Sequence, residues 1–190
     1  MKLLSRKVLL ASVQRRRFLQ LAAINIAAFS LPACRNSKSV GFALGDRFPD
    51  IMLPALEGHI TPSPSVVYRD VSLIINFWAT WCEPCRREMP SLEKLSTFFS
   101  QKDIVVIGVS VDSDQNLARE FSLRYKFTIP MLSDSNQALS NGILRIPVFP
   151  VTYLLRRDHT IARIIVGARD WADPVMVDEI EGLLAVQRKE

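Results

Sequence analysis

The stretch VSLIINFWATWCEPCRREM, residues 71–89, joins a strand-like segment to a cysteine pair and the start of a helix. Its first part, residues 71–79, is a nearly continuous apolar and β-branched run, which is typical of a strand buried on both faces of a sheet. Cys82 and Cys85 follow, and Pro84 between them suits a first helical turn, where a missing N–H costs nothing. The order of strand, Cys-x-x-Cys and helix therefore predicts an α/β protein.

This placement of the cysteines favours a redox dithiol. At a helix N-terminus, unpaired backbone N–H groups and the helix dipole stabilise a thiolate on the first cysteine, so we expect Cys82 to attack disulfides. Cys85, one turn further along, is placed to attack the resulting mixed disulfide. We expect Trp81 to form an exposed lid over the sulfurs. Glu83, beside the thiolate, opposes its extreme acidification.

Two other interpretations of the cysteine pair stay open, namely half of a zinc site and a structural disulfide. Zinc needs four ligands, and the rest of the chain offers only Cys34, His59 and His159, none of them in a second close pair. A disulfide that closes a loop over two intervening residues restrains the unfolded chain little. We therefore predict thiol–disulfide exchange without a metal or any other cofactor.

Beyond the cysteines, the sequence resembles the TlpA/ResA/CcmG (DsbE) group of membrane-tethered, thioredoxin-like reductases over roughly residues 45–185. NFWATWCEPCRREMP (76–90) is similar to the group's active-site block, and VVIGVSVDSD (105–114) to its second core strand. LAREFSLRYKFTIPMLSD (117–134) resembles the helix and strand that the group inserts into the fold. The resemblance implies a thioredoxin-like fold with an N-terminal β-hairpin extension and a central βα-type insertion.

The resemblance also implies a client-binding segment. LRIPVFPVTYLLRRDHTI (144–161) aligns with the block that contains the group's cis-proline, which places that proline at Pro150. A cis bond there turns the chain sharply, so the backbone of Phe149 faces Cys82 and can pair with an extended client strand. Trp81, Glu83 and Pro84 belong to the same expected contact surface. The simpler alternative is that Pro150 only ends a loop before an edge strand.

The resemblance also suggests which residue transfers the proton. Asn76 stands where thioredoxin has a buried aspartate, and an amide cannot accept the proton. The resemblance nominates Glu88, which lies one helical turn beyond Cys85 and can face the dithiol. The alternative is a surface carboxylate that pairs with Arg86 or Arg87.

The first 34 residues form a separate export segment. A basic front precedes an uncharged apolar stretch of 16 residues, 18–33. The string RRRFLQ resembles the twin-arginine pattern, with Arg15 and Arg16 as the pair, and LPAC resembles a lipobox that would be lipidated at Cys34. Without cleavage, the apolar stretch is short of the roughly 20 residues of a spanning helix but still serves as an anchor.

These features predict three parts of the chain. Residues 1–34 are an export or lipoprotein signal or a membrane anchor, residues 35–44 are a flexible tether, and residues 45–190 are the thioredoxin-like domain. Lipidation at Cys34 and retention of an uncleaved N-terminal anchor both predict the same location. The domain would lie in the periplasm or on the cell-surface side of the cytoplasmic membrane.

The basic excess of the chain belongs to the export segment. The chain carries 24 basic and 19 acidic residues, a net charge of +5, with a pI of about 9.4. Residues 1–33 hold six basic residues and no acidic one, which leaves 18 against 19 and a net charge of −1 elsewhere. The high pI therefore reflects targeting, and we expect no nucleic-acid partner. A domain of about 145 residues buries an adequate core, and we expect a monomer.

Together, these observations predict a membrane-tethered, extracytoplasmic thiol–disulfide oxidoreductase that reduces protein disulfides through Cys82 and Cys85. The resemblance implies clients in cytochrome c maturation or copper-site assembly. A membrane dithiol donor would supply the electrons, because this compartment lacks the cytosolic thiol pool. Three alternatives stay open: a Cu(I)-binding chaperone, a peroxiredoxin and a dithiol oxidant.

Overall fold

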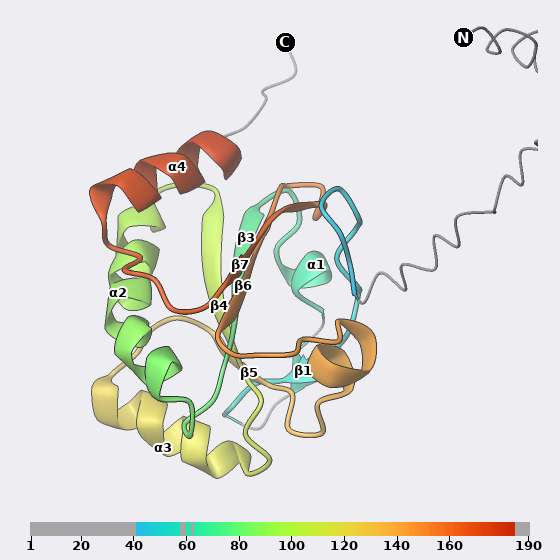
Figure 1. Cartoon of the computed structure of the whole chain (residues 1–190), viewed down its shortest axis with the longest axis vertical. Helices are drawn as coiled ribbons and strands as arrows, with labels where there is room; N and C mark the ends of the chain where they lie inside the picture. Colours follow the sequence, from blue (N-terminus) through green and yellow to red (C-terminus); the bar gives the residue numbers. More distant parts are fainter. Residues whose placement is uncertain (1–40, 58–59, 62, 185–190) are drawn as a thin grey trace, which may run out of the picture. The chain divides into compact units, whose positions relative to one another are not determined.

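A five-stranded mixed sheet forms the centre of the computed structural model, which describes residues 41–57, 60–61 and 63–184. The strand order is β5-β4-β3-β6-β7 (Figure 1). The strands are β3 (Ser72–Trp78), β4 (Ile104–Ser110), β5 (Met131–Ser133), β6 (Val151–Leu155) and β7 (Ile161–Val166). β3, β4 and β5 run parallel, whereas β6 runs antiparallel to both β3 and β7.

The helices pack against both sides of this sheet. Within the described residues they are α1 (Pro64–Val67), α2 (Glu83–Phe99), α3 (Gln115–Tyr125), the π-helix η2 (Ala138–Ile143) and α4 (Pro174–Leu184). Figure 1 shows α2, α3 and α4 on one side of the sheet, with α1 and the orange η2 on the other. The sequence pattern did not predict η2.

The central position of β3 explains its composition. All seven of its residues are buried, because β4 and β6 flank it and helices cover both faces. Side chains on both faces of such a strand must be apolar or have internal hydrogen-bond partners. Phe77 and Trp78 fill the core, while Ser72 and Asn76 are polar and need hydrogen-bond partners.

α2 begins at the cysteine pair and continues through Pro90 to Phe99. Its buried residues recur at helical spacing on one face: Cys85, Glu88, Met89, Leu92, Leu95 and Phe99. Five of these six residues are apolar or sulfur-containing, so the helix packs on the sheet in the usual way. Glu88 is a carboxylate on the buried face, which sets it apart from the exposed Glu83 and the half-buried Glu93 of the same helix.

Both predicted additions to the thioredoxin-like fold are present. β1 (Leu53–Pro54) and β2 (Ile60–Thr61) pair antiparallel as the N-terminal hairpin. The central insertion supplies α3 and β5, and β5 pairs with β4 at the edge of the sheet. The predicted α/β fold class is therefore confirmed.

The predicted export segment and tether, residues 1–34 and 35–44, lie outside the described residues except for 41–44. Arg15, Arg16, Cys34 and His59 are likewise not described. Among the described residues, no helix combines the length and the apolar character needed to cross a bilayer.

Candidate active site

The two cysteines lie at the start of α2, shortly after β3 ends. Their Sγ atoms are 2.02 Å apart, as in a disulfide bond. Cys82 is the N-cap of α2, and its sulfur accepts a hydrogen bond from the backbone N–H of Cys85 at 3.3 Å. Cys82 is 6% exposed and Cys85 is fully buried at 0%. Cys82 is thus the more accessible residue of the two, and its sulfur lies where helix N–H groups stabilise a thiolate.

A buried acid holds the turn that leads into Cys82. The carboxylate of Asp112 accepts the Thr80 backbone N–H at 3.0 and 3.1 Å and the Thr80 hydroxyl at 2.6 Å. Sequence reasoning missed this contact, although a signal was present. Asp112 follows β4, and the carboxyl ends of neighbouring parallel strands meet at one edge of a sheet, where sites commonly form.

The predicted client-binding residues meet beside the cysteines. The Phe149–Pro150 peptide bond is cis, and Val151, which follows it, pairs with Phe77 near the end of β3. Trp81 is 62% exposed, and its ring lies edge-on to Phe149 with the centroids 6.0 Å apart. The aromatic pair thus spans the helix start and the cis-proline segment.

Glu83 and Pro84 occupy the exposed first turn of α2. The Glu83 carboxylate forms ion pairs with Arg86 and, at 3.7 Å, with Arg87. Two cations therefore offset its charge. Its influence on Cys82 is smaller than that of the isolated carboxylate that the sequence suggested.

Glu88 is a buried carboxylate at 3% exposure. Its Oε1 accepts the Asn76 amide at 2.8 Å, while Oε2 accepts the Arg169 backbone N–H at 3.0 Å and the Trp171 indole N–H at 2.9 Å. Burial raises the pKa of Glu88 above its usual range, although these three hydrogen bonds and the Arg169 charge act in the opposite direction. The alternative of a solvated surface carboxylate is wrong.

The partners of Glu88 come from distant parts of the chain. Asn76 also donates to the Thr152 hydroxyl at 2.9 Å, because β6 places Thr152 directly opposite Asn76. Arg169 and Trp171 follow β7, and no local pattern marks them as contacts of α2. Sequence reasoning missed these three residues, since only the packing of the strands and the loop after β7 brings them to Glu88.

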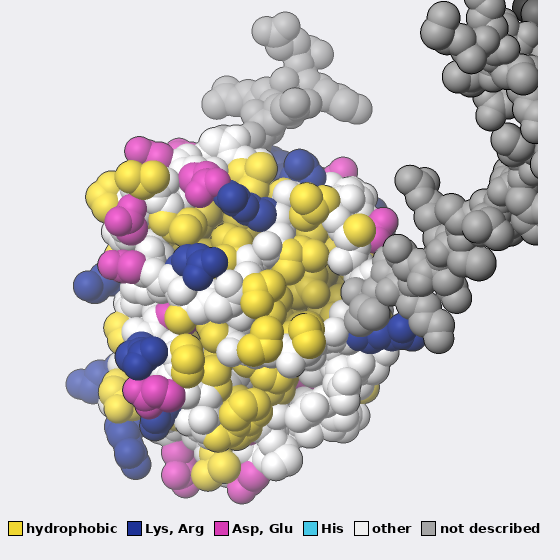
Figure 2. Space-filling view, viewed as in Figure 1, with side chains coloured by type: hydrophobic (Ala, Val, Ile, Leu, Met, Phe, Trp, Pro, Cys, Tyr) yellow, Lys and Arg dark blue, Asp and Glu magenta, His cyan; other side chains and the backbone are white. Residues whose placement is uncertain are grey.

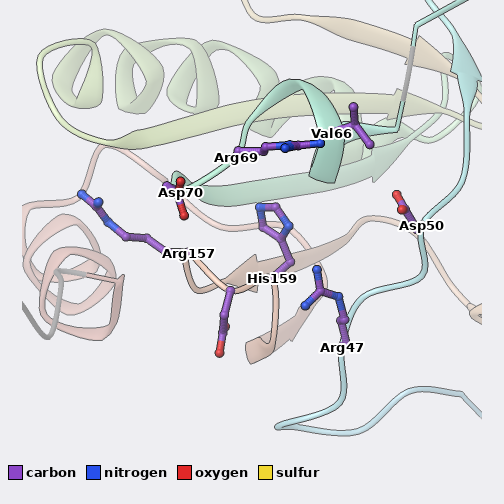
Figure 3. A pocket seen from close by; sticks show the side chains of 8 residues that line it. Arg47, Asp50, Val66, Arg69, Asp70, Arg157 and His159 are labelled. Carbon is purple, nitrogen blue, oxygen red and sulfur yellow. The ribbon is translucent and has the colours of Figure 1, made fainter. Parts of the chain in front are cut away.

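A cavity of about 430 Å³ lies near the start of β3, at the end opposite the cysteines. Figure 3 shows the side chains that line it. Its lining residues are Arg47, Asp50, Val66, Arg69, Asp70, Arg157, Asp158 and His159. Internal contacts occupy several of these groups: Asp158 accepts from Thr160, and His159 Nε2 lies 3.2 Å from the Tyr68 carbonyl oxygen. His159 adopts a left-handed turn conformation, with φ of 61°.

Within the described part of the chain, no group of three or more His, Cys, Asp or Glu side chains is arranged to hold a metal ion.

The AhpC/TSA family model matches residues 44–164, which is more than half of the chain. The chain belongs to the AhpC/TSA family. It is 28% identical over 179 residues to thiol-disulfide oxidoreductase ResA of Oceanobacillus iheyensis, covering 90% of this chain and 89% of that protein. It is 32% identical over 147 residues to the thioredoxin-like protein YneN of Bacillus subtilis, covering 76% and 84%.

Solved structures support the same fold. A candidate thiol:disulfide interchange protein DsbE of Chlorobium tepidum matches with a TM-score of 0.67 at 22% identity, over 75% of this chain and 99% of that one. StoA of Bacillus subtilis matches with a TM-score of 0.57 at 19% identity, over 72% and 96%. At such identities the likeness establishes the fold alone. The predicted resemblance is confirmed, and so, at the level of enzyme class, is the prediction of a thiol-disulfide oxidoreductase.

Proposed function

We propose that this AhpC/TSA-family protein is a membrane-tethered, extracytoplasmic enzyme that reduces protein disulfides through Cys82 and Cys85. The observation that carries the proposal is the position of the Cys82 sulfur. This sulfur caps α2 and accepts the Cys85 N–H, and Cys82 is the more exposed of the two cysteines. An attacking thiol needs this combination of thiolate stabilisation and access.

The reaction transfers two electrons from the dithiol to the client. The Cys82 thiolate attacks one sulfur of the client disulfide, which forms a mixed disulfide and releases the other client sulfur as a thiolate. Cys85 then loses its proton and attacks the Cys82 sulfur, which frees the second client thiolate and leaves the Cys82–Cys85 disulfide. We assign the exchange of the Cys85 proton to Glu88, since a carboxyl group with a raised pKa can both accept and return a proton.

Apolar surface beside the cysteines supports a polypeptide client. Trp81 and Val148 are exposed large apolar residues on the two segments that flank the dithiol. Figure 2 shows hydrophobic side chains in a band across one face of the molecule, with charged side chains mainly at its margins. An extended client would pair with the Phe149 backbone beside Pro150 and rest against Trp81, while Glu83 and Pro84 form the opposite rim.

The reducing direction and the clients rest on the resemblance to reductases of cytochrome c maturation and copper-site assembly. A membrane dithiol donor would return the protein to its reduced form. A glutathione redox titration of the chain tests the direction. We expect a midpoint closer to thioredoxin, about −270 mV, than to the oxidant DsbA, about −120 mV. A midpoint near the DsbA value contradicts the reductase proposal and favours a dithiol oxidant.

The proposed location makes a separate prediction about the export segment. Replacing Arg15 and Arg16 by lysine is expected to impair export, because the twin-arginine route reads the pair as an address while general secretion requires mainly positive charge. Cys34→Ser is expected to leave export intact and to abolish incorporation of radiolabelled fatty acid. A lipid chain contributes about 0.8 kcal/mol per buried methylene, so the wild type is expected to resist salt washing from membranes.

Fractionation of the same variants provides the control for that prediction. If the wild-type protein stays in the membrane fraction without incorporating lipid, an uncleaved N-terminal anchor replaces the lipoprotein assignment. If the wild-type protein is cytosolic, the extracytoplasmic location is wrong.

A further inference from the structure

Asp112 is a buried carboxylate, bonded to the turn before Cys82, that the proposed reaction does not use. It is 1% exposed, and the donors to its carboxylate are all neutral. They are the N–H and hydroxyl of Thr80 and, at 2.8 Å, the hydroxyl of Ser110. None of the ion pairs found among the described residues includes Asp112. Each of these contacts donates a hydrogen to the Asp112 side chain, which accepts through both oxygens.

Hydrogen bonds and a short stretch of backbone connect this carboxylate to the turn that presents Cys82. Thr80 precedes Cys82 by two residues, which limits the separation of their Cα atoms to about 7 Å. The Cys82 N–H donates to the Ala79 carbonyl at 3.2 Å, so the segment forms a tight turn. On the other side, the N–H of Val111 donates to the Trp78 carbonyl at 2.9 Å. The Asp112 loop is thus bonded both to the end of β3 and to the turn that presents Cys82.

We propose that Asp112 is a positioning residue for the dithiol. It fixes the turn before Cys82, and its buried negative charge opposes formation of the Cys82 thiolate, which keeps the cysteine pair reducing. The physical basis is that a like charge disfavours an anion nearby, and low-dielectric surroundings screen the effect less than solvent does. Stabilising the thiolate favours the reduced form and makes a dithiol more oxidising, so an opposing charge acts the other way. The proposal rests on the assignment of Cys82 as the attacking thiol.

Asp112→Asn in the full-length chain removes the charge and keeps the shape. The asparagine Oδ1 can still accept from Thr80, and its Nδ2 can donate to the Ser110 hydroxyl oxygen. We expect the pH at which half of Cys82 is alkylated to fall by up to about one unit, a tenfold change in the ionisation constant. The redox midpoint is expected to rise by up to about 30 mV, which is a tenfold change for a two-electron couple.

Asp134→Asn is the matched control. Asp134 is equally buried and follows the next strand, β5. Its carboxylate accepts the N–H groups of Leu139 at 3.1 Å and Ser140 at 2.7 Å, and no hydrogen bond joins it to Thr80. Both substitutions are expected to lower the unfolding temperature. Only Asp112→Asn is expected to shift the alkylation profile and the midpoint strongly, since a merely structural role would not separate the two variants.

A wild-type measurement covers the case in which Asp112→Asn does not fold. Because coupling between two sites is reciprocal, the carboxyl carbon NMR signal of Asp112 in the reduced protein is expected to shift as Cys82 ionises. No such shift, an unchanged profile in a folded Asp112→Asn, or equal shifts in both asparagine variants would overturn the proposal. Mass spectrometry of the alkylated protein tests separately whether Cys82 is the attacking thiol and whether the charge of Asp112 acts on the dithiol. If Cys85 reacts first, the role assigned to Cys82 fails, while a shift specific to Asp112→Asn would still show the effect of the charge.

Discussion

Cys85→Ser is expected to accumulate covalent complexes with client proteins, whereas Cys82→Ser is expected to trap none. The sulfur of Cys82, which we propose as the attacking group, lies at the N-cap of α2, where it accepts the Cys85 N–H. Without the Cys85 thiol, the mixed disulfide has no internal group to resolve it. Cys82→Ser leaves only a fully buried thiol, which cannot reach a client disulfide. Loss of the attacking sulfur is expected to slow disulfide reduction by at least about a thousandfold.

The two serine variants serve as controls for each other. Each loses the Cys82–Cys85 disulfide and exchanges one sulfur for oxygen, so the effects of the lost disulfide on stability are matched. Non-reducing electrophoresis of the tagged chain after rapid acid quenching, followed by mass spectrometry, detects the complexes and identifies the client. If Cys82→Ser traps clients and Cys85→Ser does not, the roles of the two cysteines are reversed.

Glu88→Gln is expected to slow disulfide exchange by on the order of a hundredfold near neutral pH, the usual contribution of a proton-transfer group. Glutamine keeps the shape and an acceptor oxygen but cannot carry the proton of Cys85. The pH profile of thiol alkylation is also expected to move to lower pH, because the ionised neighbour that favours protonated thiols is gone. Stopped-flow alkylation across a pH series measures this shift.

Stability provides an independent readout for Glu88. Its pKa is raised above the ordinary value of 4.5, with burial as the main cause. Between that value and the raised one, the folded protein binds more protons than the unfolded chain. The contribution of Glu88 is therefore fully present below the ordinary value and is lost as pH rises through the raised value. The free energy of unfolding of the wild type, relative to Glu88→Gln, is expected to fall with rising pH over this window.

Glu93→Gln is the control for both effects. Glu93 lies on the same helix, and its carboxylate accepts from the backbone N–H of Thr128 at 3.0 and 3.1 Å, far along the chain from the dithiol. It is expected to alter stability without changing the alkylation profile. Alkylation profiles that match the wild type in Glu88→Gln would remove Glu88 from the reaction, despite its buried position.

The sequence was most informative where the determining interactions are short in range. The succession of a buried strand, the cysteine pair and a helix can be predicted from consecutive residues. N-cap geometry and the tolerance for Pro84 depend on the first helical turn alone. The hairpin of β6 and β7 after Pro150 is local in the same sense, since β-branched residues flank a short turn. The π-helix Ala138–Ile143 was missed because no propensity rule distinguishes it from a loop.

Only the tertiary structure decided the environment of the site. The residue type and helical position of Glu88 fit either a buried or a solvated carboxylate, and the choice depended on Trp171 and Arg169, more than 80 residues away. The contact between Asp112 and Thr80 likewise required the parallel pairing of β3 with β4. A sequence by itself determines which chemical groups lie at the start of a helix. Burial, and with it the proton affinity and the charge felt by those groups, depends on which distant segments exclude water from them.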